Sequence, residues 1–256
     1  MALPLVTAIT PIYSGLPHGY LDEMTATLAN NRTPIEVILV SDAETLAWAT
    51  PIAARHLPTL AVVEDSNNVG HRRNLALRRA RGEYAGAFDA DDMHLPGGVD
   101  HLVEYLQQHP RYTAIFSRPV HTDEDGYAVT VTDEPSDRSW THAELRAFRE
   151  HRREGWSKWG HYPMLPSSGI WRTDVLQAGP GWDERCDGNK FEDIPPIAHA
   201  AAVGPIRTTS RITMKHRFHA DALGTRIPPG DEIIEIIKDV EKLEKGPRFP
   251  YALTEN

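Results

Sequence analysis

Strand-like and helix-like segments alternate through the first half of the chain, and this alternation limits the possible folds more than any other feature. Ile35–Val40 is almost entirely apolar, as expected for a strand covered on both faces. Tyr20–Ala29 places its apolar residues at helical spacing. The sequence predicts further strands at Leu5–Thr10, Leu60–Val63 and Tyr84–Phe88, and a helix over Asn74–Arg81. The pattern indicates an α/β fold with a mostly parallel sheet whose ligands bind beyond the carboxyl ends of the strands.

The second half of the chain is less regular. Apolar residues between Val99 and Leu106 predict a helix that ends before Pro110, and Thr113–Ser117 follows as a strand. Residues 122–166 are polar and irregular around a predicted helix near Thr141–Arg152, and so long a loop is often functional. Residues 233–243 carry an apolar stripe that predicts a C-terminal helix. We expect a single domain.

Composition excludes several classes of protein. The chain has 27 Lys and Arg against 36 Asp and Glu, a formal net charge of −9, which argues against a nucleic-acid partner. The first residues do not have the pattern of a signal peptide, and no apolar stretch approaches the ~20 residues that cross a bilayer, so we expect a cytoplasmic protein without an integral membrane segment. The single cysteine, Cys186, excludes an intrachain disulfide.

An acidic cluster, Asp89-Ala90-Asp91-Asp92, follows the predicted strand Tyr84–Phe88 directly. Carboxylates at the tip of a buried strand are costly unless something compensates their charge. Magnesium or manganese would do so, because both ions prefer oxygen ligands. The alternative interpretation is that these residues only cap a helix or form a turn.

Several motifs appear in a fixed order along the chain, in this cluster and on both sides of it. They are Thr10-Pro11-Ile12-Tyr13, Val40-Ser41-Asp42, Asn68-Val69-Gly70 with Arg73-Asn74, Ala80-Arg81-Gly82-Glu83-Tyr84, Asp89-Ala90-Asp91-Asp92, Gly181-Trp182-Asp183-Glu184 and Glu192-Asp193. In this order they resemble the inverting family 2 glycosyltransferases, over about Leu5 to Arg226. The acidic cluster corresponds to the D-x-D metal motif of that family.

The resemblance implies a GT-A fold, in which a Rossmann-like sheet carries an appended acceptor-binding part. It also implies transfer of a sugar from a nucleoside-diphosphate sugar to an acceptor hydroxyl, with Mn²⁺ or Mg²⁺ as cofactor. We expect a nucleotide-binding half (1–92), an acceptor and catalytic half (93–226), and a C-terminal helix and tail (227–256).

The family pattern also implies roles for individual residues. Asp193 would be the general base, which requires it to lie within hydrogen-bond reach of the acceptor hydroxyl. Asp92 would ligate the metal. The donor would contact Pro11, Tyr13 and Asp42 at its nucleobase, Arg72 and Arg73 at its ribose or phosphates, Asp91 at its ribose, and Ser168 and Gly169 at its sugar, with Asp89 in support.

Three departures from the family pattern bear on these roles. The first is Ser14 in the first nucleotide-binding loop, and the second is Ser41 with Ala43 in the second loop, where the family usually has other residues. These two departures leave the identity of the nucleobase open. Ile194-Pro195-Pro196 follows the Glu192-Asp193 motif, and we do not expect an ordinary helix to begin there, which leaves the position of Asp193 open.

Two histidines follow a β-like run, Arg211–Met214. His219 matches the family position that reaches the metal, and His216 is the second candidate. They could instead be exposed side chains on a basic strand. Lys215 and Arg217 could attract a diphosphate.

Trp156 and Trp159 are candidates for acceptor binding, because aromatic faces stack on sugars. They could equally anchor the long loop to its domain. Trp171 is expected in the core. The acceptor, whether a polysaccharide precursor, a natural product or a protein, and the oligomeric state are left open.

Two other functions compete with sugar transfer. A sugar-activating nucleotidyltransferase would share the sheet and the acidic site, but would carry a glycine-rich, basic loop after the first strand, which residues 11–18 do not provide. A noncatalytic nucleotide-sugar-binding protein is the other alternative.

Overall fold

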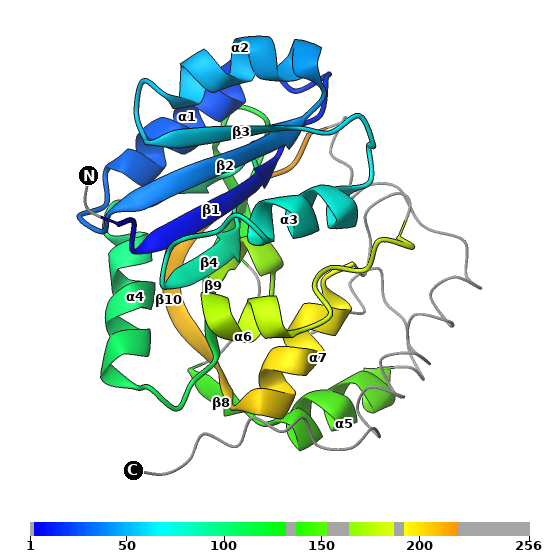
Figure 1. The fold of residues 1–256 in the computed structure, drawn as a ribbon. Helices are drawn as coiled ribbons and strands as arrows, with labels where there is room; N and C mark the ends of the chain where they lie inside the picture. Colours follow the sequence, from blue (N-terminus) through cyan, green and yellow to red (C-terminus); the bar gives the residue numbers. More distant parts are fainter. Residues whose placement is uncertain (1–2, 132–136, 153–163, 187–191, 220–256) are drawn as a thin grey trace.

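One large mixed sheet, with helices on both faces, forms the centre of the molecule (Figure 1). The computed structural model describes residues 3–131, 137–152, 164–186 and 192–219. The main strand order is β3-β2-β1-β4-β9-β6-β10-β5, while β7 pairs with β6 and β8 with β10. These strands are β1 (Val6–Pro11), β2 (Ile35–Ser41), β3 (Thr59–Val63), β4 (Tyr84–Ala87), β5 (Met93–His94), β6 (Ala114–Thr122), β7 (Ala128–Val131), β8 (Arg138–Trp140), β9 (Gly169–Arg172) and β10 (Ile206–Arg217).

The first four strands of the chain run parallel, with β1 between β2 and β4. Their carboxyl ends therefore meet at one edge of the sheet, where Pro11, Ser41 and Ala87 are the last strand residues. β9 is antiparallel to both of its neighbours, β4 and β6, and β10 returns parallel to β6.

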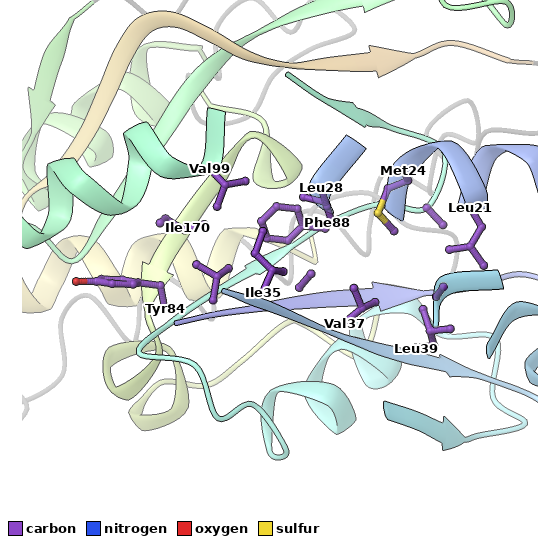
Figure 2. Packing of buried hydrophobic residues seen from close by; sticks show 14 of the residues in the cluster. Leu21, Met24, Leu28, Ile35, Val37, Leu39, Tyr84, Phe88, Val99 and Ile170 are labelled. Carbon is purple, nitrogen blue, oxygen red and sulfur yellow. The ribbon is translucent and has the colours of Figure 1, made fainter. Parts of the chain in front are cut away.

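Alternate residues of the central strands belong to two separate cores. Val37 and Leu39 of β2 lie in one core, whereas Ile38 and Val40 lie in the other. A strand with period 2 that is covered on both faces needs apolar residues at every position, which explains the continuous apolar run in the sequence. Figure 2 shows part of the first core, in which Leu21, Met24 and Leu28 lie close to β2.

The helices cover the two faces of the sheet as two layers. α1 (His18–Ala29), α2 (Ala43–Ala53) and α4 (Gly98–Gln108) contribute to the core in Figure 2. α3 (Val69–Leu77), α5 (His142–Arg152), α6 (Thr173–Ala178) and α7 (Ile194–Val203) contribute to the other core. This arrangement confirms the expected α/β architecture with helices on both faces.

Some sequence predictions differ from the structure. α2 was not predicted, although Asp42 caps its first turn. α3 begins at Val69 rather than Asn74, with Asn68 as its N-cap. β7 and β8 lie within the stretch expected to be irregular. Trp171 is fully buried, as expected.

The expectation that no ordinary helix begins at Ile194 was wrong. α7 starts there, with prolines in its first turn. The first N–H groups of a helix have no partner within the helix, so proline loses nothing at these positions. The predicted C-terminal helix, Trp156 and Trp159 lie outside the described residues.

β10 carries the chain across the sheet to the acidic cluster. Its pairing with β6 shifts register between Thr208 and Ile212 and again before Met214. Such irregularities bend a strand and redirect its side chains. Beyond the shifts, the last residues of β10 continue to pair with β6 up to Thr122. No helix in the described part of the chain is long and apolar enough to cross a membrane.

Candidate active site

The acidic cluster lies in a turn just past the end of β4, at the edge where the parallel strands end. The Asp92 N–H donates to the Asp89 carbonyl oxygen at 3.2 Å, which closes this turn. In α/β sheets, this edge is where ligands bind. The turn therefore brings Asp89, Asp91 and Asp92 together at the place expected for a site.

Asp92 is the most deeply buried carboxylate of the cluster, with 1% of its surface exposed. Its Oδ1 accepts the Arg217 N–H at 3.1 Å, while its Oδ2 has no hydrogen-bond partner among the described residues. Burial, reinforced by the charges of Asp91 and Asp89, raises the pKa of Asp92 well above its ordinary value. A carboxylate in this position needs a cation to stay ionised.

The chemistry of the cluster fits a divalent cation completed by a ligand. Within the described residues, no group of three or more His, Cys, Asp or Glu side chains is arranged to hold a metal by itself. Mg²⁺ commonly binds through one or two carboxylates plus substrate phosphates. The unpaired oxygen of Asp92 suits this mode, with the remaining positions filled by a diphosphate.

The two candidate histidines have different surroundings. His219 is buried, and its Nε2 lies 2.8 Å from Asp91 Oδ2. His216 lies beside His121, with 3.1 Å between their Nδ1 atoms. Burial lowers the pKa of His216, while the charges of Asp91 and Asp89 oppose the shift. His219 is thus the histidine in contact with the acidic cluster, through Asp91.

Arg217 fixes the acidic turn from the end of β10. It is only 3% exposed, and its Nε donates to the Asp91 carbonyl oxygen at 3.0 Å. Its other guanidinium nitrogens donate to the Glu124 carbonyl oxygen and, at 2.5 Å, to Glu23 Oε2. The guanidinium also lies 4.2 Å from the centre of the Tyr20 ring. Every guanidinium nitrogen thus has a protein partner, so Arg217 holds the turn in place.

The predicted nucleobase residues lie at the ends of β1 and β2. Asp42 is the N-cap of α2 and accepts the Thr45 N–H at 2.8 Å and the Thr45 hydroxyl at 2.9 Å. The Thr45 N–H lowers the pKa of Asp42. Pro11 is buried and Tyr13 is half-buried against the first core. Asp42 therefore has a structural role in α2, and its nucleobase contact stays a prediction.

Arg72 is buried beneath these loops. Its Nη1 donates to the Ile12 carbonyl oxygen at 2.5 Å, and its Nη2 donates to Asn67 Oδ1 at 3.1 Å. Burial lowers the pKa of Arg72. The side chain ties the loop after β1 to the loop after β3.

Arg73 joins the acidic cluster to the Glu192-Asp193 motif. Its Nη2 donates to Asp89 Oδ1 at 2.7 Å, and its Nη1 donates to Glu192 Oε1 at 2.5 Å. Burial alone would lower the pKa of Arg73, but the two carboxylates outweigh it and raise the pKa above its ordinary value.

Asp193 is buried, with 7% of its surface exposed, at the N-cap of α7. Burial raises its pKa to about 6, with a further contribution from Asp89, whereas Arg73 opposes the rise. A pKa near the working pH suits a general base. The structure therefore brings the predicted base into one electrostatic network with the acidic cluster.

The Gly181-Trp182-Asp183-Glu184 loop docks on α3. Asn74 Nδ2 donates to the Trp182 carbonyl oxygen and to Glu184 Oε1, both at 2.8 Å, and the Trp182 N–H donates to Asn74 Oδ1 at 2.8 Å. His71 Nδ1 lies 2.9 Å from Glu184 Oε2. The Asp183 N–H donates in turn to the Glu192 carbonyl oxygen at 2.9 Å. α3 thus supports both sides of the site.

Ser168 and Gly169 are buried between β4 and β6. The Ser168 hydroxyl donates to the Leu165 carbonyl oxygen at 2.7 Å, and its own carbonyl oxygen accepts the Ser117 hydroxyl at 3.0 Å. A Cβ on Gly169 would lie 2.3 Å from the Phe116 ring. Glycine is required here by the close approach of β6.

Two supporting contacts were missed in the sequence. Glu192 was not expected to anchor Arg73, and Arg217 was not expected to hold the acidic turn. Nothing local marks either role, because the contacts join residues 119 and 126 positions apart in the chain.

Comparison with known proteins agrees with this geometry. The model of the family described as "Glycosyl transferase family 2" matches residues 7–170, more than half of the chain. The chain belongs to glycosyl transferase family 2. An uncharacterised glycosyltransferase of Haemophilus influenzae is 26% identical over 124 aligned positions, in a match that covers 44% of this chain and 36% of that protein. The chain thus matches about a third of the length of this curated relative.

Solved structures of two other proteins share the fold. TarS of S. aureus, residues 1–349 in complex with UDP-GlcNAc, has a TM-score of 0.68 and 17% identity, covering 92% of this chain and 65% of that one. The mannosyltransferase PcManGT of Pyrobaculum calidifontis, in complex with GDP-Man and Mn²⁺, has a TM-score of 0.61 and 17% identity, covering 97% and 67%. At such identities the likeness establishes the fold.

Proposed function

We propose that this chain transfers a sugar from a nucleoside-diphosphate sugar to an acceptor hydroxyl, with inversion at the anomeric carbon and with the help of Mn²⁺ or Mg²⁺. The observation that carries the proposal is the connection of the buried Asp193 segment, through Glu192 and Arg73, to the acidic turn after β4. The proposed base, whose pKa is raised, is thereby linked to the proposed site of the charged leaving group by one chain of contacts. Family membership and two structural neighbours with bound nucleotide sugars support the same activity.

In the proposed reaction, the Asp193 carboxylate takes the proton of the acceptor hydroxyl as that oxygen bonds to the anomeric carbon. The bond between the anomeric carbon and the diphosphate breaks on the opposite face, and the nucleoside diphosphate leaves with the electron pair. A divalent cation held by Asp92 would neutralise charge on the departing diphosphate. His219 is the second candidate ligand, and its contact with Asp91 keeps it beside the cluster.

We assign donor binding to the loops at the carboxyl ends of the parallel strands. Pro11, Tyr13 and Asp42 would contact the nucleobase, Asp91 the ribose, and the segment at Ser168 and Gly169 the sugar. Arg72 and Arg73 have protein partners, so we place them behind the pocket rather than on the donor. The nucleobase is left open between uridine and guanosine donors, which the two structural neighbours represent. Trp156 and Trp159 stay predictions for the acceptor, as do the division into halves and the cytoplasmic location.

The decisive experiment incubates the protein with Mn²⁺ and a panel of UDP- and GDP-sugars and measures the products. Slow release of free nucleoside diphosphate in the absence of acceptor supports a transferase. In a parallel incubation with a nucleoside triphosphate and a sugar phosphate, release of pyrophosphate would instead support a nucleotidyltransferase. Binding by calorimetry without any turnover, also with candidate acceptors, would indicate a noncatalytic binding protein.

A further inference from the structure

Among the described residues, Arg73 is the one cation that bonds directly both to the acidic turn after β4 and to the Glu192-Asp193 segment. It is 5% exposed and projects from α3 between the turn after β4 and the start of α7. Its two terminal nitrogens are taken, by Asp89 at 2.7 Å and by Glu192 at 2.5 Å. A bidentate cation between two carboxylates fixes their separation as well as their charge.

We propose that Arg73 is a positioning residue that holds Asp193 in its working place, rather than a contact to the donor phosphates. The proposal rests on the proposed function, and it departs from the role that the family resemblance implies for this arginine. Arg73 acts through Glu192, whose backbone continues into Asp193 at the beginning of α7.

The rest of α3 shows why Arg73 stays in this position. Asn74, the next residue, bonds to Trp182 and Glu184. A Cβ on Gly70 would lie 2.6 Å from the Asp183 carbonyl oxygen, so the helix packs against that loop without a side chain between them. The Asp183 N–H bonds to the Glu192 carbonyl oxygen. Arg73 is therefore held on a helix that is itself fixed to the segment carrying the base.

Charge leads to the same conclusion. The Arg73 cation lowers the pKa of Asp193, while burial and Asp89 raise it. Removing the cation leaves Asp193 next to Asp89 without compensation, so the carboxyl would hold its proton to higher pH. The base would then be inactive over part of the pH range in which the wild type works.

The test compares Arg73→Met and Arg73→Lys with the wild type, and uses Arg79→Met as a matched control. Arg79 follows α3, is exposed, and its guanidinium donates to the Leu75 carbonyl oxygen of that helix. Two quantities are measured: binding of UDP or GDP with MnCl₂ by calorimetry, and the pH profile of kcat for sugar transfer or donor hydrolysis.

If Arg73 positions the base, Arg73→Met binds nucleoside diphosphate within about threefold of the wild type, whereas loss of a charged phosphate contact weakens binding by about tenfold or more. The acidic limb of the kcat–pH profile of Arg73→Met moves to higher pH by about one unit. This is the low end of the pKa shift that a neighbouring cation causes. Arg73→Lys restores the limb in large part, because the charge returns. Arg79→Met changes neither quantity.

The opposite result, tenfold weaker nucleotide binding with an unshifted acidic limb, would overturn the proposal and restore the phosphate contact. If Arg73→Met does not fold, Glu192→Gln supplies the second test. It should lower kcat while leaving nucleotide binding unchanged, and an unchanged kcat would contradict the proposal. Failure of the proposed function would be recognised separately, because the wild type itself would then show no transfer or hydrolysis.

Discussion

Asp193 carries a carboxyl whose protonation is set by its surroundings rather than by its own chemistry. Burial raises its pKa to about 6, and Asp89 and Arg73 act on it in opposite directions. An exposed aspartate would be ionised under all physiological conditions but would be a weaker base. At the scale of single residues, the proposed function therefore depends on neighbours that do not touch the substrate.

The role proposed for Asp193 predicts how kcat falls on the acidic side of the pH–activity profile. Below pH ~6 the Asp193 carboxyl is protonated and cannot accept the acceptor proton, so kcat should fall about tenfold for each further pH unit. The measurement is kcat between pH 5 and 9 at saturating donor. A profile that stays flat through this limb would exclude Asp193 as the titrating base.

Asp193→Asn is the matching variant, because asparagine keeps the shape and removes the basic function. Transfer should fall by about 10²–10⁴-fold, the usual contribution of a general base. Nucleoside diphosphate binding should persist, since Asp193 lies on the acceptor side of the pocket in the proposed mechanism. Full activity in this variant would refute the assignment.

At Asp92, we expect the stability of the metal-free protein and Mn²⁺-dependent nucleotide binding to respond to substitution in opposite directions. In Asp92→Asn, the buried, partly unpaired carboxylate disappears, so the melting temperature of the metal-free protein should stay the same or rise. The same change should abolish the Mn²⁺-dependent part of nucleotide binding. Calorimetry with UDP or GDP, with and without MnCl₂, checks this. Equal Mn²⁺-dependent binding in both proteins would rule out Asp92 as a ligand.

At the scale of elements, α3 connects the two acidic segments, and its close docking depends on a glycine. The Asp183 carbonyl oxygen would lie 2.6 Å from a Cβ on Gly70, closer than backbone atoms tolerate. α3 and the loop at 181–186 therefore behave as one unit. The sequence predicted this helix only from Asn74, so its first residues from Val69 and its N-cap Asn68 were missed.

Gly70→Ala should accordingly separate α3 from that loop. We expect the free energy of unfolding to fall by about 1–3 kcal/mol, the usual cost of overpacking, as measured by urea denaturation. Gly19→Ala in α1 is the control, because a Cβ there meets nothing within 4 Å and should be neutral or slightly stabilising. Equal stability of wild type and Gly70→Ala would show that the loop can move away freely.

At the scale of the whole molecule, the sequence predicted what depends on periodicity and motif order. Ile35–Val40 identified a strand covered on both faces, and the acidic cluster was placed correctly at the sheet edge. The partners of Arg73 and Arg217 were not predictable, because their contacts depend on how distant segments meet in the sheet. Asp42 shows a different limit of prediction from sequence. An aspartate at this position can cap a helix or contact a ligand, and the residue type is the same for both roles.

The stability of the whole fold should fall in mild acid, in part because of His199. This histidine is buried in α7 against Gly179, and burial lowers its pKa, although the Val175 backbone opposes the shift. Below pH ~6.5 the unfolded chain binds a proton that the folded chain resists, so stability is lost as pH falls, by up to ~1.4 kcal/mol per pH unit. In His199→Leu, the difference in unfolding free energy between pH 7.5 and pH 5.5 should shrink. An unchanged difference would assign the acid sensitivity to other groups.

The hydrogen bond from Arg217 to Asp91 spans 126 residues of chain, and this separation has a consequence for biosynthesis. At ~5–20 residues per second, the ribosome makes the acidic turn on the order of 10 s before it makes the arginine that holds it. During that interval the parallel strands can already pair, but the turn lacks the Arg217 N–H and guanidinium. A nascent chain should therefore acquire a folded nucleotide-side sheet first and an ordered site only after β10 has been made.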